Sequence, residues 1–408
     1  MSSFGVERIA IYTPRFSVSA VELAAARGRD PEAARARYLL DTRSVAPPYE
    51  DTVTMATNAA RQVLSSEDAS AVRLLIVATE SGIDFGKPIS TWVHRHCGLP
   101  AECRNFEIKH ACFGGTAALK TAIALLMTEG RRNAKALVIC SDLTRPFPQE
   151  GYDFAGGAVA VALLVSDKAG ILKIDMSRCG YWTLEVADTF RPTASSEIGD
   201  NQLSLCTYLD ALDGAYDNYL QQAGACNYDS DFHAHIYHAP FPGMTREAHK
   251  CLLARDPTMN AEKIADSFQS KVLPGLTFAR KLGTAYGASN FVSLFGVLRE
   301  CQTLAGPNRV SIYSYGSGCQ AEFYEGIVPE GAGKAVDFES IDCQLATRKT
   351  ISVEEYDQMA RARQAQIDQP CFHALSDPGI AEFEELYVGR HLLFLEGVKD
   401  FRRNYAWS

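Results

Sequence analysis

Cys112 lies where a strand-like stretch gives way to an alanine- and leucine-rich stretch with helical spacing, in NFEIKHACFGGTAALKTAIALL (residues 105–126). The unpaired N–H groups and the dipole of a helix start stabilise negative charge, so a cysteine there is suited to act as a thiolate nucleophile. Gly114 and Gly115 follow it, and their backbones leave room and N–H donors for the oxyanion of a bound thioester. From this stretch alone, a buried structural cysteine is the alternative.

Glu80 and His238 each follow an apolar, strand-like run and could take part in acid–base chemistry. Glu80 ends the run LLIVATE (residues 74–80), where partial burial raises the pKa of a carboxyl group towards that of a useful base. His238 stands in YHAPF (residues 237–241), a loop stiffened by Pro240. The alternatives are structural: a helix or turn cap for the glutamate and a core position for the histidine.

Three histidines also form a pattern that could bind a metal. His233, His235 and His238 give H-x-H-x-x-H, and imidazoles are common zinc ligands. Along a strand, however, residues 233 and 235 face one side and residue 238 faces the other. We therefore predict no metal site.

Two parts of the chain repeat the same order of elements, and this repeat positions the reactive residues. The strand and polar elbow LLIVATESG match DFHAHIYHAPF, the helix start CFGGTAALKTAIALL matches GTAYGASNFVSLFGVL, and the strand KALVICSD matches RVSIYSYGSG. The offset stays at roughly 160–175 residues, as in a duplicated α/β unit. We predict one half over residues 1–166, carrying Glu80 and Cys112. The second half, residues 167–408, carries His238 and a helix-and-strand elaboration from about residue 332.

Composition and charge exclude several functional classes. The 408 residues carry a formal net charge of −9 and no Lys/Arg run longer than three residues, which argues against a nucleic-acid surface. No apolar run approaches the roughly 20 residues that span a bilayer, and the first residues lack the layout of a secretion signal. We expect a cytoplasmic protein that does not bind membranes. The 12 cysteines include no C-x-x-C pair, so we expect free thiols.

Together, VATESGID, KHACFGGTAAL, YHAPF and YSYGSG resemble the hydroxymethylglutaryl (HMG) synthase family of the thiolase superfamily. The opening YTPRFSVSAVELAAARGRDPE, the mid-chain FRPT and the ending FLEGVKDFRRNYA extend the resemblance over nearly the whole chain. It implies a thiolase-like α/β fold of two pseudo-duplicated, five-layered αβαβα halves. It also implies an acyltransferase in which Cys112 receives an acetyl group, Glu80 removes a proton from its methyl group, and His238 hydrogen-bonds the β-keto oxygen of the acceptor.

The motifs IKHACFGGTAAL and SYGSGCQAEFY resemble the branch of the family that installs β-branches on polyketides held by acyl carrier proteins. There, one carrier protein donates acetyl and another holds the β-ketoacyl acceptor. The phosphopantetheine arm, or coenzyme A, bears the substrate, and no cofactor is bound permanently. The resemblance assigns substrate contacts to Gly114, Gly115, Thr284, Ser317 and Gly318. Thr284 departs from the family pattern, since primary-metabolism members have asparagine there, and Asn290 is nearly two turns further on.

Partners follow from the same resemblance. Acyl carrier proteins are acidic, so a docking surface on this chain should be basic. Two groups of side chains are candidates: Arg246, His249 and Lys250, and Arg27, Arg29, Arg35 and Arg37. Ordinary solvated helix faces are the alternative for both groups. The family also implies a homodimer, because thiolase-like enzymes bury central helices across a two-fold axis.

Three other functions stay open at this point. A mevalonate-pathway HMG-CoA synthase would use acetyl-CoA and acetoacetyl-CoA. A ketoacyl-carrier-protein synthase shares the fold, but it would need a second histidine or an asparagine where Thr284 stands and would not need Glu80. A non-catalytic scaffold would bind carrier proteins without using the three reactive residues.

Overall fold

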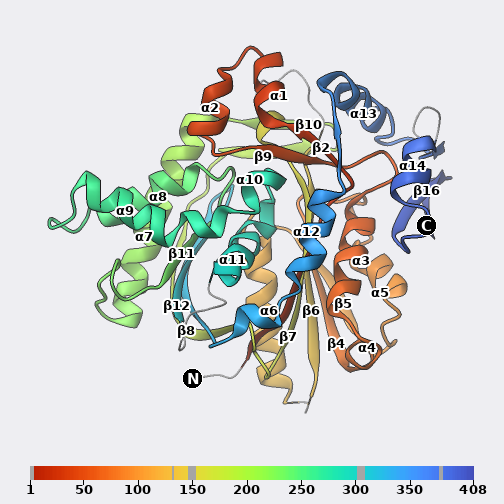
Figure 1. Ribbon diagram of the computed structural model, residues 1–408. Coiled ribbons are helices and arrows are strands. Elements are labelled where there is room, and N and C mark those ends of the chain that lie inside the picture. The colour runs from red at the N-terminus through yellow and green to blue at the C-terminus, as the bar shows by residue number, and fades with distance from the viewer. Residues whose placement is uncertain (1–3, 131–132, 146–152, 301–307, 376–379) are drawn as a thin grey trace.

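A computed structural model of the chain describes residues 4–130, 133–145, 153–300, 308–375 and 380–408. The strands of its main sheet are β1 (Gly5–Tyr12), β4 (Val72–Ala78), β5 (Arg104–Ile108), β6 (Lys135–Leu143), β7 (Ala158–Ser166), β8 (Leu172–Thr183), β11 (Ala234–Tyr237), β12 (Asn308–Gly316) and β13 (Gln320–Val328). Their order across the sheet is β11-β12-β13-β8-β1-β7-β6-β4-β5 (Figure 1).

The strand order contains the duplication. Outward from the contact between β1 and β8, the series β1-β7-β6-β4 in one half matches β8-β13-β12-β11 in the other. The directions match as well, because β4–β6 and β11–β12 are parallel whereas β6–β7 and β12–β13 are antiparallel. The predicted pseudo-duplicated α/β fold is confirmed. The chain passes from one half to the other between Ser166, where β7 ends, and Leu172, where β8 begins.

The two halves of the main sheet form two of the five layers, and helices form the other three. In the middle, α6 (Gly114–Glu129) and α11 (Ser289–Glu300) pack between strands of both halves. The first half is covered on its outer face by α3 (Thr52–Val63) and α5 (Ser90–His96). The second half is covered by α7 (Asn201–Ala223), α8 (Met244–Leu253) and α9 (Ala261–Lys271). Strands with both faces covered are apolar throughout, as in the sequence AVAVALLVS of β7.

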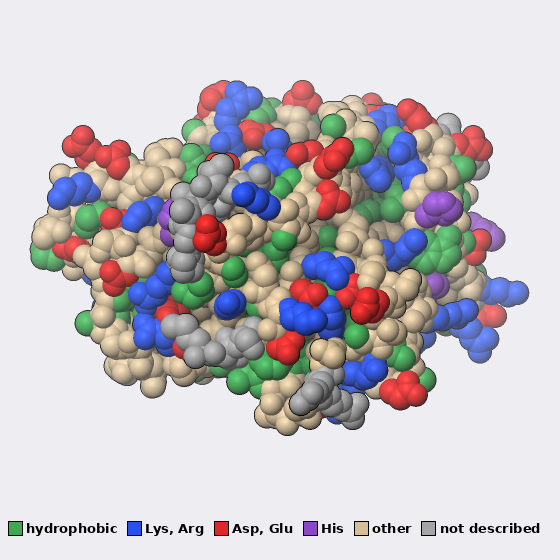
Figure 2. Space-filling model, turned by 60° about the horizontal axis from the view of Figure 1, so that its bottom comes forward, with side chains coloured by type: hydrophobic (Ala, Val, Ile, Leu, Met, Phe, Trp, Pro, Cys, Tyr) green, Lys and Arg blue, Asp and Glu red, His purple; other side chains and the backbone are tan. Residues whose placement is uncertain are grey.

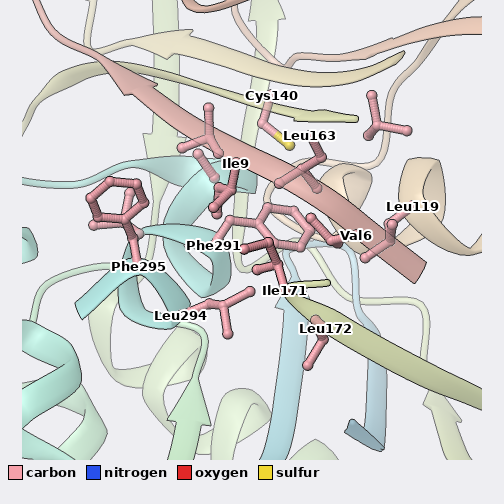
Figure 3. Packing of buried hydrophobic residues seen from close by; sticks show 14 of the residues in the cluster. Val6, Ile9, Leu119, Cys140, Leu163, Ile171, Leu172, Phe291, Leu294 and Phe295 are labelled. Atoms are coloured by element: carbon pink, nitrogen blue, oxygen red, sulfur yellow. The ribbon is translucent and has the colours of Figure 1, made fainter. Parts of the chain in front are cut away.

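The core between the halves centres on α11. Phe291 of α11 points to the space between Cys140 of β6, Leu119 of α6 and Val6 of β1, and all four are buried (Figure 3). Residues 111–129 are apolar and long enough to cross a membrane by composition, but here they form this central helix and its approach, packed against strands. Cys140 behaves as a small apolar residue, and the cysteines in the described part of the chain are free thiols; Cys301 lies outside it.

Smaller sheets complete the fold. β2 (Phe16–Ser19), β3 (Thr42–Val45) and β14 (Lys349–Ile351) form one in the order β14-β2-β3, and β9 (Thr189–Thr193) pairs with β10 (Ser196–Gly199) in a hairpin. A third contains β15 (Phe372–His373), β16 (Leu393–Lys399) and β17 (Arg402–Trp407). The remaining helices are α1 (Ala20–Ala26), α2 (Pro31–Ala36), α4 (Ser66–Ala71), α10 (Ala279–Leu282), α12 (Phe338–Ala346), α13 (Val353–Ala365) and α14 (Ile380–Leu386).

The surface carries charges of both signs. On the face shown in Figure 2, Lys and Arg side chains are interspersed with Asp and Glu instead of gathering by sign. Such mixing suits a chain with a formal net charge of −9 and offers no extended basic surface on that face.

Candidate active site

Polar turns of both halves converge on the start of α6. Glu80 follows β4 by two residues and Cys112 precedes α6 by two residues. In the second half, the end of β12 lies against the same loop, because a Cβ atom built on Gly316 would lie 2.6 Å from the Phe113 nitrogen. Carboxyl ends of parallel strands meet at one edge of a sheet, so β4 and β6 bring their following residues together.

Cys112 and Glu80 form a direct hydrogen bond. The Cys112 thiol donates to Glu80 Oε1, with a Sγ–Oε1 distance of 3.0 Å. Burial, and then the neighbouring Glu80 carboxylate, raise the pKa of the Cys112 thiol well above its usual value. Burial also raises the pKa of Glu80. The pair therefore shares a proton that can move from sulfur to the carboxylate.

This arrangement differs from the expectation of a thiolate stabilised by the helix start. Cys112 lies just before α6, and burial together with the neighbouring Glu80 carboxylate raises the pKa of its thiol instead of lowering it. Proton transfer to Glu80 is therefore the way for this thiol to become nucleophilic.

Asp142 fixes the turn that carries Glu80. Its Oδ1 accepts hydrogen bonds from the backbone N–H of Glu80 at 2.9 Å, from that of Ser81 at 3.0 Å and from Thr79 Oγ1 at 2.9 Å. Burial, followed by repulsion from Glu80, raises the pKa of Asp142 to about 7. The sequence reasoning missed this residue because ICSD was interpreted only as the end of an apolar strand. The sequence feature that could have identified Asp142 is an acidic residue at the end of a buried apolar strand, the same feature that identified Glu80.

His238 directly follows β11 and is held on three sides. Its Nδ1 lies 2.7 Å from Ser289 Oγ, its N–H donates to the Tyr313 carbonyl at 2.7 Å, and its own carbonyl accepts from the Tyr208 hydroxyl at 2.8 Å. Burial lowers the pKa of His238 to about 3, so the imidazole is neutral. Sequence reasoning missed Ser289, which begins α11.

Thr284 and Asn290 occupy different surroundings. Within the described residues, the side-chain hydrogen bond of His238 is with Ser289 and not with Thr284. The Thr284 N–H donates to the Ala155 carbonyl at 2.9 Å. Asn290 is buried, and its Nδ2 donates to the Tyr313 carbonyl of β12 at 2.8 Å. A substrate contact by Thr284 stays a prediction.

The glycines beside Cys112 have a packing role. A Cβ atom on Gly115 would lie 2.1 Å from the Gly287 carbonyl oxygen and 2.8 Å from Cys140 Sγ, so the space beside it is filled by residues of both halves and not left for substrate. A Cβ atom on Gly114 would lie 3.5 Å from the Ala78 methyl, which is ordinary contact. The Gly114 N–H donates to the Ala111 carbonyl at 3.3 Å.

These contacts predict opposite results for neighbouring substitutions in α6. Gly115→Ala should lower the free energy of unfolding by about 1–3 kcal/mol, because backbone of the second half must shift. Gly114→Ala is the matched control and should leave stability unchanged or raise it slightly, since alanine favours a helix. Thermal unfolding of both variants checks this, and equal midpoints would contradict the close packing of α6 against Gly287.

The turn after β12 holds Ser317 and Gly318. The Gly318 N–H donates to Asp188 Oδ1 at 2.9 Å, and the Tyr315 hydroxyl donates to Asp188 Oδ2 at 2.6 Å. Gly318 has φ of +102°, a conformation that favours glycine. The turn is thus anchored by a fully buried aspartate from the segment before β9.

The predicted docking residues divide into two groups. Arg35, Arg37, Arg246 and Lys250 are exposed. His249 was predicted wrongly: it is buried, with Nδ1 2.9 Å from the Tyr237 hydroxyl and Nε2 3.0 Å from Ser267 Oγ. It lies on the inner face of the amphipathic α8, where burial lowers its pKa to about 4.

Arg27, another predicted docking residue, is not available as a free positive charge. It forms ion pairs with Asp153 and Asp357 and is half-buried, so its charge is already neutralised.

The histidine pattern His233, His235 and His238, which could have bound a metal, has other partners in the structure. His235 is buried and its Nδ1 lies 2.8 Å from Ser311 Oγ, whereas the Nδ1 of His238 lies 2.7 Å from Ser289 Oγ. No group of three or more side chains suited to a metal occurs within the described residues.

Comparison with known proteins gives consistent matches along the chain. The family model "Hydroxymethylglutaryl-coenzyme A synthase N terminal" matches residues 2–170, and "Hydroxymethylglutaryl-coenzyme A synthase C terminal" matches residues 258–408. The polyketide biosynthesis 3-hydroxy-3-methylglutaryl-ACP synthase PksG of Bacillus subtilis is 35% identical over 100% of both chains. The hydroxymethylglutaryl-CoA synthase of Enterococcus faecalis is 30% identical over 90% of this chain and 94% of its own.

Solved structures agree with these relatives. The HMG synthase of the curacin biosynthetic pathway superposes with a TM-score of 0.93 at 37% identity, covering 99% of this chain and 100% of its own. The same enzyme in complex with an acetyl donor-ACP, where ACP denotes acyl carrier protein, gives a TM-score of 0.91 at 36% identity with the same coverage.

Proposed function

The chain belongs to the hydroxymethylglutaryl synthase family, and we propose that it joins an acetyl group to the β-keto group of an acceptor, both delivered on acyl carrier proteins. It is an acyltransferase that forms a carbon–carbon bond in polyketide β-branching. The observation that carries this proposal is the Cys112–Glu80 contact at 3.0 Å, placed where turns of both halves meet. Similarity to PksG and to the curacin enzyme, solved with its donor carrier protein, supports carrier proteins as substrates over coenzyme A.

The first step loads the enzyme. The Cys112 proton passes to Glu80, the sulfur attacks the acetyl thioester, and the tetrahedral intermediate collapses to acetyl-Cys112. The proton on Glu80 then goes to the departing phosphopantetheine thiolate, which leaves as a thiol. This restores the Glu80 carboxylate beside the new thioester.

The second step forms the carbon–carbon bond. Glu80 removes a proton from the acetyl methyl group, and the resulting enolate attacks the β-keto carbon of the acceptor. His238 is neutral, so it can donate a hydrogen bond to the β-keto oxygen without bringing a charge into the buried site. The protonated Glu80 returns its proton to the alkoxide, giving a tertiary alcohol. Water then hydrolyses the Cys112 thioester and leaves a free carboxylate on the product.

Offering acetyl-carrier protein and acetyl-CoA side by side tests the carrier-protein assignment. Intact-protein mass spectrometry should show one acetyl group on Cys112, acquired efficiently only from the carrier protein. Efficient acetylation by free acetyl-CoA would instead favour the mevalonate-type synthase. No acetylation from either donor would contradict the enzymatic proposal and leave the non-catalytic scaffold.

The exposed basic residues form one surface, which we call the α2–α8 surface: Arg35 and Arg37 from the α2 region, and Arg246 and Lys250 from α8. Arg246 Nη1 donates to the Ala36 carbonyl at 3.3 Å, which joins the two regions. Arg246 and Lys250 are four residues apart and share a helix face. An acidic carrier protein fits such a surface by charge.

Charge reversal tests this docking surface. Arg246→Glu should raise KM for the acetyl-carrier protein about tenfold or more at low salt, with a smaller effect on kcat, because a repulsive charge slows encounter. Arg402→Glu, an exposed arginine on β17, is the matched control and should leave KM unchanged. Equal effects of the two substitutions would place docking elsewhere.

The homodimer is also part of the proposal. β5 is the outermost strand of the main sheet, so its free edge can pair with a second copy. Beside it, α6 exposes the apolar side chains of Ala124 and Met127. Analytical ultracentrifugation should give a dimer, and Phe106→Pro in β5 should weaken it. A monomer at micromolar concentration would contradict the proposed homodimer.

A cytoplasmic location of the protein stays a prediction.

A further inference from the structure

The hairpin of β9 and β10 reaches into the site through Arg191. The Arg191 Nη1 donates to the Glu80 carbonyl at 3.1 Å and lies 3.4 Å from Ser81 Oγ. Its Nε donates to Glu197 Oε2 on β10 at 2.7 Å, and its guanidinium lies 5.3 Å from the centre of the Tyr286 ring. Only 11% of the Arg191 side chain is exposed, so this charge is held in place by the protein and not by solvent.

The same short segment also holds the second half. Asp188, three residues before Arg191, accepts hydrogen bonds from Gly318 N–H and from the Tyr315 hydroxyl. At one end of the segment, Asp188 is therefore hydrogen-bonded to the turn after β12. At the other end, Arg191 is hydrogen-bonded to the turn that carries Glu80. This is the stretch around the FRPT motif, for which the sequence offered no chemistry.

The charges around Glu80 come from several elements. The acidic or proton-sharing neighbours are Cys112, Asp142 of β6 and Glu197 of β10. The basic neighbours are Arg191 and, with a smaller effect on the pKa of Glu80, Arg145. Burial raises the pKa of Glu80, Arg191 opposes that rise, and Glu197 adds to it. Arg191 also opposes the rise in the pKa of Asp142. Among the neighbouring groups, Arg191 favours the ionised form of Glu80 most strongly.

We propose that Arg191 is a positioning residue for the condensation: it holds the Glu80–Ser81 turn against Cys112 and supplies the positive charge that keeps the Glu80 carboxylate ionised and ready to accept a proton. Glu197 limits this effect by sharing the guanidinium. The inference rests on the proposed function, because it assigns Arg191 a role through Glu80 in that reaction. It implies that the β9–β10 hairpin determines both the position and the charge state of the Glu80 carboxylate.

Solvent deuterium exchange into the methyl group of acetyl-Cys112, without acceptor, measures the proton removal by Glu80 directly. We expect Arg191→Gln to slow the exchange about tenfold or more and to move its half-maximal rate to higher pH, because an acid that loses its cationic neighbour ionises later. Glu197→Gln should move the half-maximal rate to lower pH. Arg191→Lys keeps the charge but not the paired hydrogen bonds, so it should slow exchange while leaving the midpoint near that of the unaltered protein.

The outcomes separate this inference from the proposed function. If the unaltered protein is acetylated on Cys112 but exchanges no methyl hydrogen, the proposed role of Glu80 fails, and that of Arg191 with it. If the unaltered protein exchanges and the Gln variants shift the midpoint in opposite directions, the inference is supported. If it exchanges and both Gln variants are merely slower with an unmoved midpoint, Arg191 has only a structural role and the inference is overturned.

Discussion

Cys112→Ala is expected to abolish acetylation of the protein and to lower condensation to background, a loss of roughly 10⁴-fold or more. In the proposed reaction, the Cys112 sulfur carries the acetyl group from donor to acceptor. Its hydrogen-bond partner in the described site is the Glu80 carboxylate at 3.0 Å, which acts as a base and not as a second nucleophile. Acetyl transfer followed by mass spectrometry of the peptide containing residue 112 measures the first effect. Condensation is measured on the acceptor carrier protein.

A second cysteine provides the matched control for that experiment. Cys140 is fully buried in β6, next to α6, and has no place in the proposed reaction. Cys140→Ala should still be acetylated once, at Cys112, with some loss of stability from the cavity it leaves. Acetylation that persists in Cys112→Ala at the level of the unaltered protein would show that the nucleophile lies elsewhere.

Glu80→Gln should separate acetylation from condensation. The amide keeps the shape of the carboxylate but cannot accept a proton, so acetyl-Cys112 should form slowly, accumulate and fail to react with the acceptor. Condensation should fall by about 10³-fold, within the range for loss of a general base. Quenched samples analysed by mass spectrometry give the acetylated fraction over time, and exchange of methyl hydrogens with deuterium should be lost as well.

Glu107→Gln is the control for Glu80→Gln. Glu107 is a half-buried carboxylate on the neighbouring β5, and its Oε2 accepts from the Ile89 N–H at 2.8 Å. Its substitution should change stability but not the ratio of condensation to acetylation. If Glu80→Gln condensed normally after acetylation, a ketoacyl synthase-like enzyme, which does not need this base, would explain the site better.

The fold was predictable because the chain repeats itself. Strand and elbow patterns such as LLIVATESG and DFHAHIYHAPF became β4 and β11, which occupy corresponding places in the two halves. Apolar helices after small residues became α6 and α11 at the centre. Pairing between distant segments was not predictable in this way, and β14 beside β2 is an example, because short strands give little pattern.

The site was predictable only in part, since side-chain surroundings depend on which elements meet. Motifs identified Glu80 and Cys112, and the structure brings them into contact. His249 seemed a surface residue next to two basic neighbours, yet the inner face of α8 buries it. The raised pKa of the Cys112 thiol could not be read from a helix start, because it results from burial and from a carboxylate 32 positions earlier in the chain.

Anchoring residues were the hardest to find. Asp142 and Ser289 lie in stretches that read as apolar strand and small-residue helix start, and their partners come from other elements. Arg191 belongs to a hairpin whose role depends on reaching across to Glu80, 111 positions away. A sequence pattern records local periodicity, whereas these contacts are set by tertiary packing.

The most direct test of the central claim follows labelled carbon through the complete reaction. Carbon-13 acetyl on the donor carrier protein is mixed with a β-ketoacyl acceptor carrier protein and the enzyme, and the acceptor is analysed by mass spectrometry. The account predicts that the acceptor gains the elements of one acetic acid, with both labelled carbons retained, and that this gain disappears with Glu80→Gln. An unchanged acceptor, with labelled acetate released from Cys112 instead, would contradict the claim that this site forms a carbon–carbon bond.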